Sequence, residues 1–168
     1  WESTNRFGYS HKNIQGYLSL SQLNRLGTND YTVNAGSYLN FDNAYAHIEA
    51  GFGGDIDFIY KFQSILEYGH RLYKDVYWQL GYSYRNYPYS GDTSMVYPGL
   101  IYYFGDNYLT ANYGVSMIEG RGAGNFGTVR GNFTITKFLQ FWTGAAFGQW
   151  LYDIYGLPPG KENGYILF

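Results

Sequence analysis

The sequence predicts an all-β protein, an antiparallel up-and-down β-barrel that spans a membrane. The first observation is strict alternation in residues 76–84 and 109–117. Apolar positions such as Trp78, Leu80 and Leu109 alternate there with small or polar positions such as Gln79 and Thr110. A strand turns successive side chains to opposite faces, so each segment has one apolar and one polar face. Composition and segment length then predict which face is covered by lipid.

The composition is unusual for a soluble domain. The 168 residues include 21 tyrosines and 23 glycines, and aromatic residues make up 22 % of the chain. Only 14 % of the residues are charged, whereas about a quarter is usual for a soluble domain. The net charge of −2 argues against a nucleic-acid partner. A soluble β-sandwich or barrel with its apolar face inward is the alternative.

The segment lengths also favour a membrane barrel. Segments of about 9–11 residues suit tilted outer-membrane strands, while soluble strands cluster near about 5–6. No stretch approaches the roughly eighteen consecutive apolar residues of a membrane helix. The chain has no cysteine, which excludes disulfides and thiolate metal sites. Outer-membrane barrels turn the apolar face outward and the polar face inward.

Alternation continues in nearly every segment along the chain, from residues 3–10 onward. No helical pattern of useful length interrupts it, and residues 16–23 are the least regular segment. The larger side chains of the predicted apolar face include Phe7, Tyr9, Leu18, Leu20, Tyr31, Val33, Leu39, Phe41, Ile48, Phe52, Leu66, Tyr68, Leu72, Val76, Trp78, Leu80, Tyr82, Tyr84, Leu109, Tyr113, Val115, Met117, Val129, Phe133, Ile135, Leu139, Phe141 and Phe147.

The connections are of two kinds. Short turns near Lys12, Asn43, Lys74, Asp106 and Lys137 recur every 31 or 32 residues, a hairpin period. Looser connections rich in Gly, Asp, Ser and Pro are predicted at residues 27–30, 54–63, 88–94, 119–127 and 153–164. Outer-membrane barrels have short periplasmic turns and longer outer loops, so the short series marks the periplasmic rim.

This series predicts the strand number and the orientation. Eleven strands can be counted, and the last ends at Phe168 on the periplasmic rim, which resembles the C-terminal assembly signature of such barrels. Bacterial barrels have an even strand number with both ends in the periplasm. We therefore expect a single barrel domain over residues 1–168 whose first strand, with any preceding periplasmic region, is missing, and twelve strands in the intact protein. A barrel of eight to ten strands is the fallback.

Ionisable residues with inward parity, His47 among them, are the candidate site. Two carboxylates beside several guanidinium groups predict a structural ion-pair network in the barrel lumen, because pairing compensates charges in a narrow interior. An ion or solute path and a paired-carboxylate acid–base site are the alternatives. The predicted network consists of Glu49, Glu67, Arg71, Arg85 and Arg130.

Inward tyrosines are a second set of candidates. They either fill the interior beside inward glycines, large against small, or form stacking platforms for sugars along a channel. Filling is the favoured interpretation. The set consists of Tyr38, Tyr45, Tyr77, Tyr97 and Tyr103.

Catalysis is not predicted. Membrane-barrel hydrolases and acyltransferases place a nucleophile and a histidine near the outer rim, whereas His11, His47 and His70 lie toward the periplasmic one. None is placed beside a serine near the outer loops. The glycines of residues 120–127 lack the strand–helix context of a phosphate-binding loop. We predict no enzymatic activity, no metal and no cofactor.

Several motifs resemble one family. They are EYGHRL (67–72), GYSYRNY (81–87), PGLIYYFGD (98–106) and YLTANY (108–113), and they are similar to the YaiO-type outer-membrane β-barrel domain over residues 64–117. The resemblance implies an outer-membrane location and a helical-repeat region before the barrel. It implies no established enzymatic activity and no catalytic residues. Related barrels in exopolysaccharide export make a role in sugar transport conceivable.

The expected function is that of an integral barrel in the bacterial outer membrane with a periplasmic C-terminus. It would serve as a narrow pore or as a membrane scaffold of an envelope complex, with outer-membrane lipid and other envelope proteins as partners. The alternative is a saccharide or small-solute channel, and the third hypothesis is a membrane-embedded hydrolase or acyltransferase.

Overall fold

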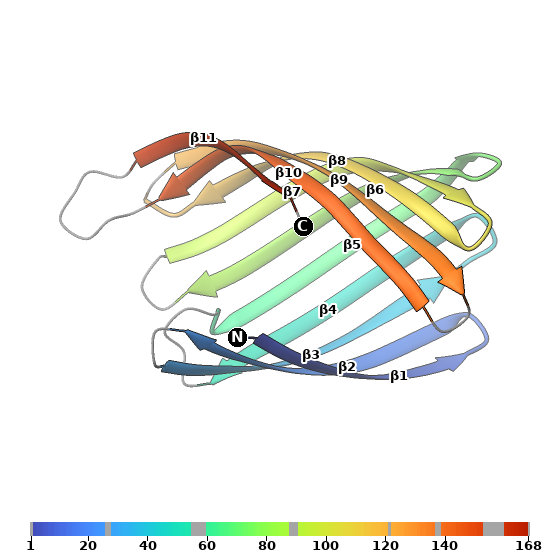
Figure 1. Cartoon of the computed structure of the whole chain (residues 1–168), viewed down its shortest axis with the longest axis horizontal. Coiled ribbons are helices and arrows are strands. Elements are labelled where there is room, and N and C mark those ends of the chain that lie inside the picture. Colours follow the sequence, from blue (N-terminus) through green and yellow to red (C-terminus); the bar gives the residue numbers. More distant parts are fainter. Residues whose placement is uncertain are drawn as a thin grey trace. The chain divides into compact units, whose positions relative to one another are not determined.

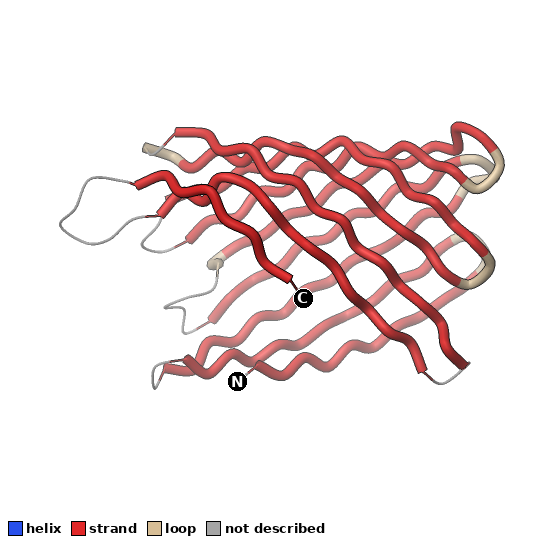
Figure 2. The backbone as a smooth tube through the Cα atoms, turned by 45° about the horizontal axis from the view of Figure 1, so that its top comes forward, coloured by secondary structure: helices blue, strands red, loops and turns tan. Residues whose placement is uncertain are grey.

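The fold is all-β, as predicted. The computed structural model describes residues 2–25, 28–54, 60–87, 91–120, 122–136, 139–152 and 160–167. Its strands, drawn in red in Figure 2, form one sheet in the order β1 to β11 (labelled in Figure 1). They are β1 (Glu2–His11), β2 (Ile14–Arg25), β3 (Thr28–Asn40), β4 (Ala44–Gly54), β5 (Phe62–Tyr73), β6 (Val76–Tyr87), β7 (Gly91–Phe104), β8 (Asn107–Ile118), β9 (Gly122–Thr136), β10 (Leu139–Tyr152) and β11 (Gly160–Leu167). The eleven predicted strands are confirmed.

The chain divides into two compact units. The first comprises Trp1–Tyr68 and Tyr82–Ser94, and the second comprises Gly69–Gly81 and Met95–Phe168. Strands β5, β6 and β7 contribute residues to both. Within the first unit β1 pairs with β2, β2 with β3, and β3 with β4, all antiparallel. Within the second, β8, β9, β10 and β11 pair antiparallel in the same sequential manner.

The predicted short turns near Lys12, Asn43, Lys74 and Asp106 are tight connections between successive strands. Lys12 and Lys74 adopt positive φ angles of 49° and 45°, and Gly105 has 63°. The turns also bond to the next hairpin: the Asn40 amide donates to the Asn13 carbonyl at 2.7 Å, and the Tyr103 amide donates to the Asp75 carbonyl at 2.9 Å. No helix in the described part of the chain is long and apolar enough to cross a membrane.

Several predicted loops are wrong at their edges because the strands extend into them. Residues 28–30, 54, 62–63, 91–94, 122–127 and 160–164 all belong to strands. Hydrogen bonds between side chains accompany the extension of β7. The Asp92 carboxylate on β7 accepts hydrogen bonds from Tyr84 at 2.5 Å and from Asn86 at 2.6 Å, both on β6. Other residues of the predicted loops (27, 55–59, 88–90, 121 and 153–159), the turn at Lys137 and the terminal Phe168 lie outside the described residues.

The two faces of the sheet have the predicted polarity, and burial is inverted relative to a soluble domain. On β6, Gln79 and Ser83 are buried, whereas Leu80 and Tyr82 are exposed. Among the described residues, the one buried hydrophobic side chain is Ile101. The buried polar side chains are Ser19, Asp30, Thr32, Asn34, His47, Glu49, Gln63, Gln79, Ser83 and Asn132. We call the face with the buried polar residues the polar face and the other the apolar face.

Candidate functional site: a polar cluster in the first unit

The most connected group of polar side chains lies on the polar face of the first unit. We call it the polar cluster, and its members are Tyr17 on β2, His47 and Glu49 on β4, and Gln63 and Glu67 on β5. Every member comes from a strand position whose parity turns it away from the apolar face. His47 is 5 % exposed and Glu49 is 9 % exposed. Buried ionisable groups of this kind require partners.

A glycine lets Tyr17 reach across a whole strand. Tyr17 is paired with Gly36 on β3, and Gly36 is paired with Glu49 on β4. A Cβ atom at Gly36 would overlap the Tyr17 ring, so the ring lies directly over this glycine. The Tyr17 hydroxyl therefore donates a hydrogen bond to Glu49 and lies 2.9 Å from Nε2 of His47.

His47 occupies the centre of the polar cluster. Its Nδ1 atom lies 2.9 Å from Oε2 of Glu67 on β5. Tyr38 is paired directly with His47 across β3 and β4, and the two rings stack with centroids 4.1 Å apart and planes 8° apart. Both nitrogens of the imidazole thus have a polar partner, and one face of its ring packs against Tyr38.

Gln63 connects Glu49 to an arginine on β6. The Gln63 amide nitrogen donates to Oε1 of Glu49 at 2.5 Å, and Oε1 of Gln63 accepts from Nε of Arg85 at 2.8 Å. Backbone bonds position this row, because Lys61 just before β5 donates to the Asn86 carbonyl and accepts from the Gly53 amide. Glu49 and Arg85 are therefore linked through an amide.

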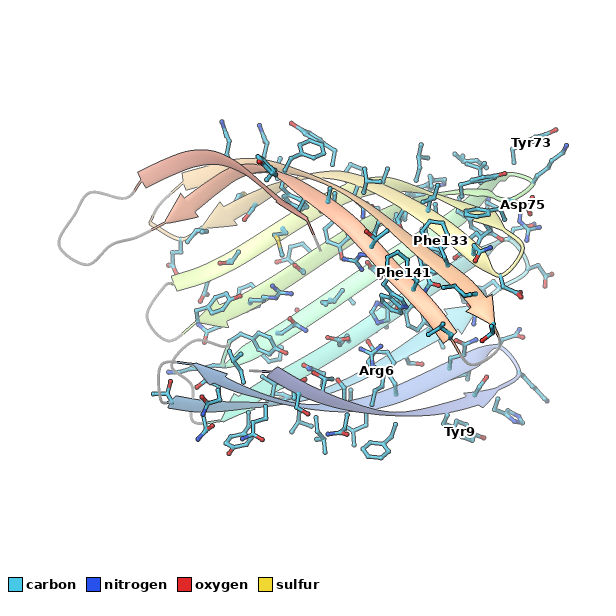
Figure 3. The ribbon with its side chains drawn as sticks, in the orientation of Figure 1. Arg6, Tyr9, Tyr73, Asp75, Phe133 and Phe141 are labelled. Carbon is cyan, nitrogen blue, oxygen red and sulfur yellow. The ribbon has the colours of Figure 1, made fainter. Side chains whose placement is uncertain are left out.

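Two further contacts border the polar cluster. The Arg6 guanidinium lies 4.5 Å from the centroid of the Tyr17 ring, and Arg6 and Tyr9 project from opposite faces of β1 in Figure 3. Tyr60, which precedes β5, donates to the Asn34 side chain at 2.7 Å and lies under Arg85. Burial raises the pKa of the Tyr60 hydroxyl above its ordinary value, so it stays protonated as a donor.

The predicted ion-pair network takes a different form in the first unit. Glu49, Glu67 and Arg85 are brought into one connected group, and the contacts that join them run through Tyr17, His47 and Gln63. Tyr17 is not among the residues that the sequence predicts for the network, and Gln63 falls in a predicted loop. The sequence contains one indication of where Tyr17 lies, because Tyr17 has the same parity as the polar residues Ser19 and Ser21.

Arg71 and Arg130 belong to the second unit, and their place in the network stays a prediction. Both side chains are exposed. Arg71 donates from Nε and Nη2 to the Tyr77 hydroxyl at 2.9 and 2.7 Å. Arg130 is paired with Thr110 on β8 and Gly144 on β10.

The predicted inward tyrosines are engaged with neighbouring side chains. Tyr77 and Tyr103 have ring centroids 5.4 Å apart, and the Tyr97 ring lies where a Cβ of Gly81 would be. Tyr38 stacks on His47, and Tyr45 is half-buried. Tyr97 over Gly81 is one case of a large ring beside a glycine, and the choice between filling and sugar stacking stays a prediction.

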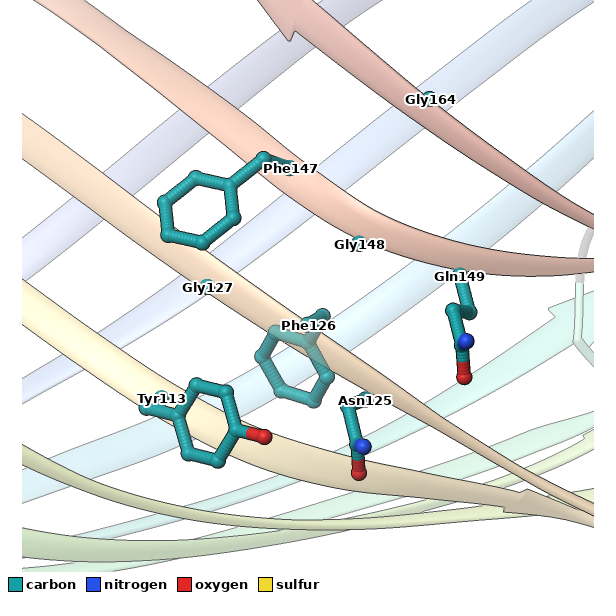
Figure 4. A pocket seen from close by; sticks show the side chains of 8 residues that line it. All are labelled: Tyr113, Asn125, Phe126, Gly127, Phe147, Gly148, Gln149 and Gly164. Atoms are coloured by element: carbon teal, nitrogen blue, oxygen red, sulfur yellow. The ribbon is translucent and has the colours of Figure 1, made fainter.

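A shallow hollow of about 390 Å³ lies in the second unit. Figure 4 shows the rings of Tyr113, Phe126 and Phe147 around the backbone of Gly127. Its walls are mainly aromatic rings and backbone, without a charged side chain, so we assign it no chemistry. Among the described residues no group of three or more His, Cys, Asp or Glu side chains could hold a metal ion.

Comparisons with protein-family models, with curated proteins and with solved structures find no match for the chain. The resemblance to the YaiO-type barrel domain therefore stays a prediction.

Proposed function

We propose that the chain is an integral outer-membrane β-barrel that acts as a narrow pore or as a membrane scaffold of an envelope complex. The inverted burial carries this proposal. Large hydrophobic side chains such as Phe52, Leu72 and Leu80 are exposed along the strands, while the buried positions are mainly polar. A soluble protein does not expose a contiguous apolar face of this extent, so lipid is its natural cover.

Aromatic groups near the strand ends support the same proposal. Phe52, Phe62 and Tyr84 form a chain of ring contacts near the loop ends of β4, β5 and β6, with centroids 5.4 and 6.2 Å apart. Near the short turns of the second unit, Phe104 contacts Tyr102 and Phe133 at 5.6 and 6.2 Å. Aromatic girdles at the two lipid interfaces are characteristic of outer-membrane barrels.

The spacing of these aromatic residues fits a bilayer. Exposed Tyr31 on β3 and exposed Phe41, the residue directly after β3, flank the apolar-face residues Val33 and Leu39. A rise of about 3.3 Å per residue separates the two aromatic positions by about 33 Å along the strand. A strand tilt near 40° reduces this to a height of about 25 Å, the height of the apolar band in such barrels.

The arrangement of the polar face favours a scaffold or narrow pore over a saccharide channel. Tyr17, Tyr38 and Tyr97 lie against His47 or over glycines of neighbouring strands. Rings held in this way are not free to stack on a sugar. Membrane-embedded catalysis stays the third hypothesis.

Tryptophan fluorescence tests the proposal, because two tryptophans lie on opposite faces. Trp78 has apolar-face parity on β6, whereas Trp142 is paired with buried Asn132 and shares its polar face. We expect strong quenching of Trp78 by lipids with brominated acyl chains. The measurement uses a chain refolded into such vesicles with the other three tryptophans changed to phenylalanine.

The matched control retains Trp142 alone, and its fluorescence should be quenched only weakly. Equal quenching of the two proteins, or a chain that stays in the aqueous phase when vesicles are floated, would overturn the membrane assignment.

A further inference from the structure

Four side chains of the polar cluster form a linear series joined by three close contacts, which we call the relay. In order they are the Glu49 carboxylate, the Tyr17 hydroxyl, the His47 imidazole and the Glu67 carboxylate. Tyr17 donates to Glu49, His47 Nε2 lies 2.9 Å from the Tyr17 oxygen, and His47 Nδ1 lies 2.9 Å from Glu67. Both ends of the series are carboxylates, which accept hydrogen bonds and donate none when ionised.

The three contacts of the relay require a fixed number of hydrogen atoms. Three hydrogen bonds require three hydrogen atoms. With both carboxylates ionised and the imidazole neutral, the four groups supply two, one from the tyrosine hydroxyl and one from the ring. The geometry is therefore satisfied only when the relay holds one additional proton. This count is the same whichever of the four groups carries that proton.

We infer that the relay is a proton-binding site that passes a proton between Glu49 and Glu67. In one arrangement the additional proton is on Glu49. Transfer moves it to the Tyr17 oxygen, while the Tyr17 proton moves to His47 Nε2 and the Nδ1 proton moves to Glu67. One O–H bond breaks at Glu49 and one forms at Glu67, so Tyr17 and His47 end neutral and nothing is oxidised or reduced.

The surroundings of His47 compensate the charges of this site. Tyr17 on β2, Tyr38 on β3, Tyr45 and Glu49 on its own strand and Glu67 on β5 are the titratable groups that face it. Two cations lie one contact further out, namely Arg6 over the Tyr17 ring and Arg85 behind Gln63. Glu49 thus has a partner outside the relay, the Gln63 amide, which in turn accepts from Arg85.

Replacement of Glu67 by glutamine tests the proton count. The amide supplies the third hydrogen covalently, so Glu67→Gln keeps three hydrogen bonds without taking up a proton. Unfolding in detergent micelles is measured between about pH 7 and 9, where free imidazole and free tyrosine titrate little. One additional proton in the folded protein lowers the folding constant by up to about tenfold per pH unit as pH rises.

We expect this slope in the wild type and in the control His11→Gln, whose side chain is exposed at a turn outside the relay. We expect it to disappear in Glu67→Gln. Should that variant not fold, Glu49→Gln makes the same substitution at the other end and carries the same expectation.

If the folding constant fell with pH at the same slope in the wild type and in the glutamine variant, the inference of a relay would be wrong. The inference rests on side-chain geometry within one unit and does not depend on lipid. Trp78 quenching can therefore fail while the relay stands, and the reverse also holds.

Discussion

At the scale of single residues, the contacts of the polar cluster depend on Gly36. Tyr17 reaches His47 and Glu49 because the intervening residue on β3 has no side chain. We predict that Gly36→Ala displaces the Tyr17 ring and destabilises the fold by about 1–3 kcal/mol, the range for overpacking. Denaturant unfolding in micelles measures this effect.

The matched control is Gly16→Ala on β2, where an added Cβ would come no closer than 3.9 Å to other atoms. It should change the free energy of unfolding by less than about 0.5 kcal/mol. Equal effects of the two substitutions would show that Tyr17 does not depend on the gap at Gly36.

Only part of the candidate site could be predicted from the residue types in the sequence. His47, Glu49 and Glu67 stood out because ionisable side chains are rare in this chain and their parity placed them on the polar face. Their actual partners were not evident. Tyr17 lies two strands away from Glu49, and the contact depends on a bare glycine between them, which no local pattern reveals.

At the scale of strands, the alternation of side chains separates two environments. Strand β6 presents Leu80 on the apolar face, 46 % exposed, between buried Gln79 and Gly81. In water, an arginine at such an exposed position would change stability by about 0.5 kcal/mol or less. At the middle of a bilayer the same arginine costs about 2–4 kcal/mol.

We therefore predict that Leu80→Arg destabilises the lipid-embedded protein by about 2–4 kcal/mol, because the charge would lie near the bilayer centre. Tyr73→Arg at the exposed turn end of β5 is the control, and should cost about 0–1 kcal/mol near the interface. Urea unfolding in vesicles gives both values. Similar small effects at the two positions would place water rather than lipid over Leu80.

At the scale of the whole molecule, contacts between side chains of the polar face affect whether a solute can bind and pass. Among the described residues, polar-face side chains contact one another within each unit, as Tyr38 does with His47 and Gln79 with Asn112. Side chains engaged in this way are less available to bind a passing solute. We predict small or no steady current when the protein is inserted into planar bilayers. A general porin inserted in the same way serves as the conducting control.

Steady single-channel current that an oligosaccharide blocks would contradict this prediction. Such a result would favour the saccharide channel and would require the inward tyrosines, Tyr77 and Tyr103 among them, to be available to sugars.

By itself, the sequence determined the all-β class, the eleven strands and the polarity of both faces. These properties depend on a period of two and on turn residues, which are local and can be read along the chain. The tertiary structure decided where the strands end and which polar groups meet. Residues 91–94 extend β7 because Asp92 finds donors on β6, and Tyr17 meets His47 and Glu49 across Gly36. Such contacts join residues far apart in sequence, so they exist only once the register between strands is fixed.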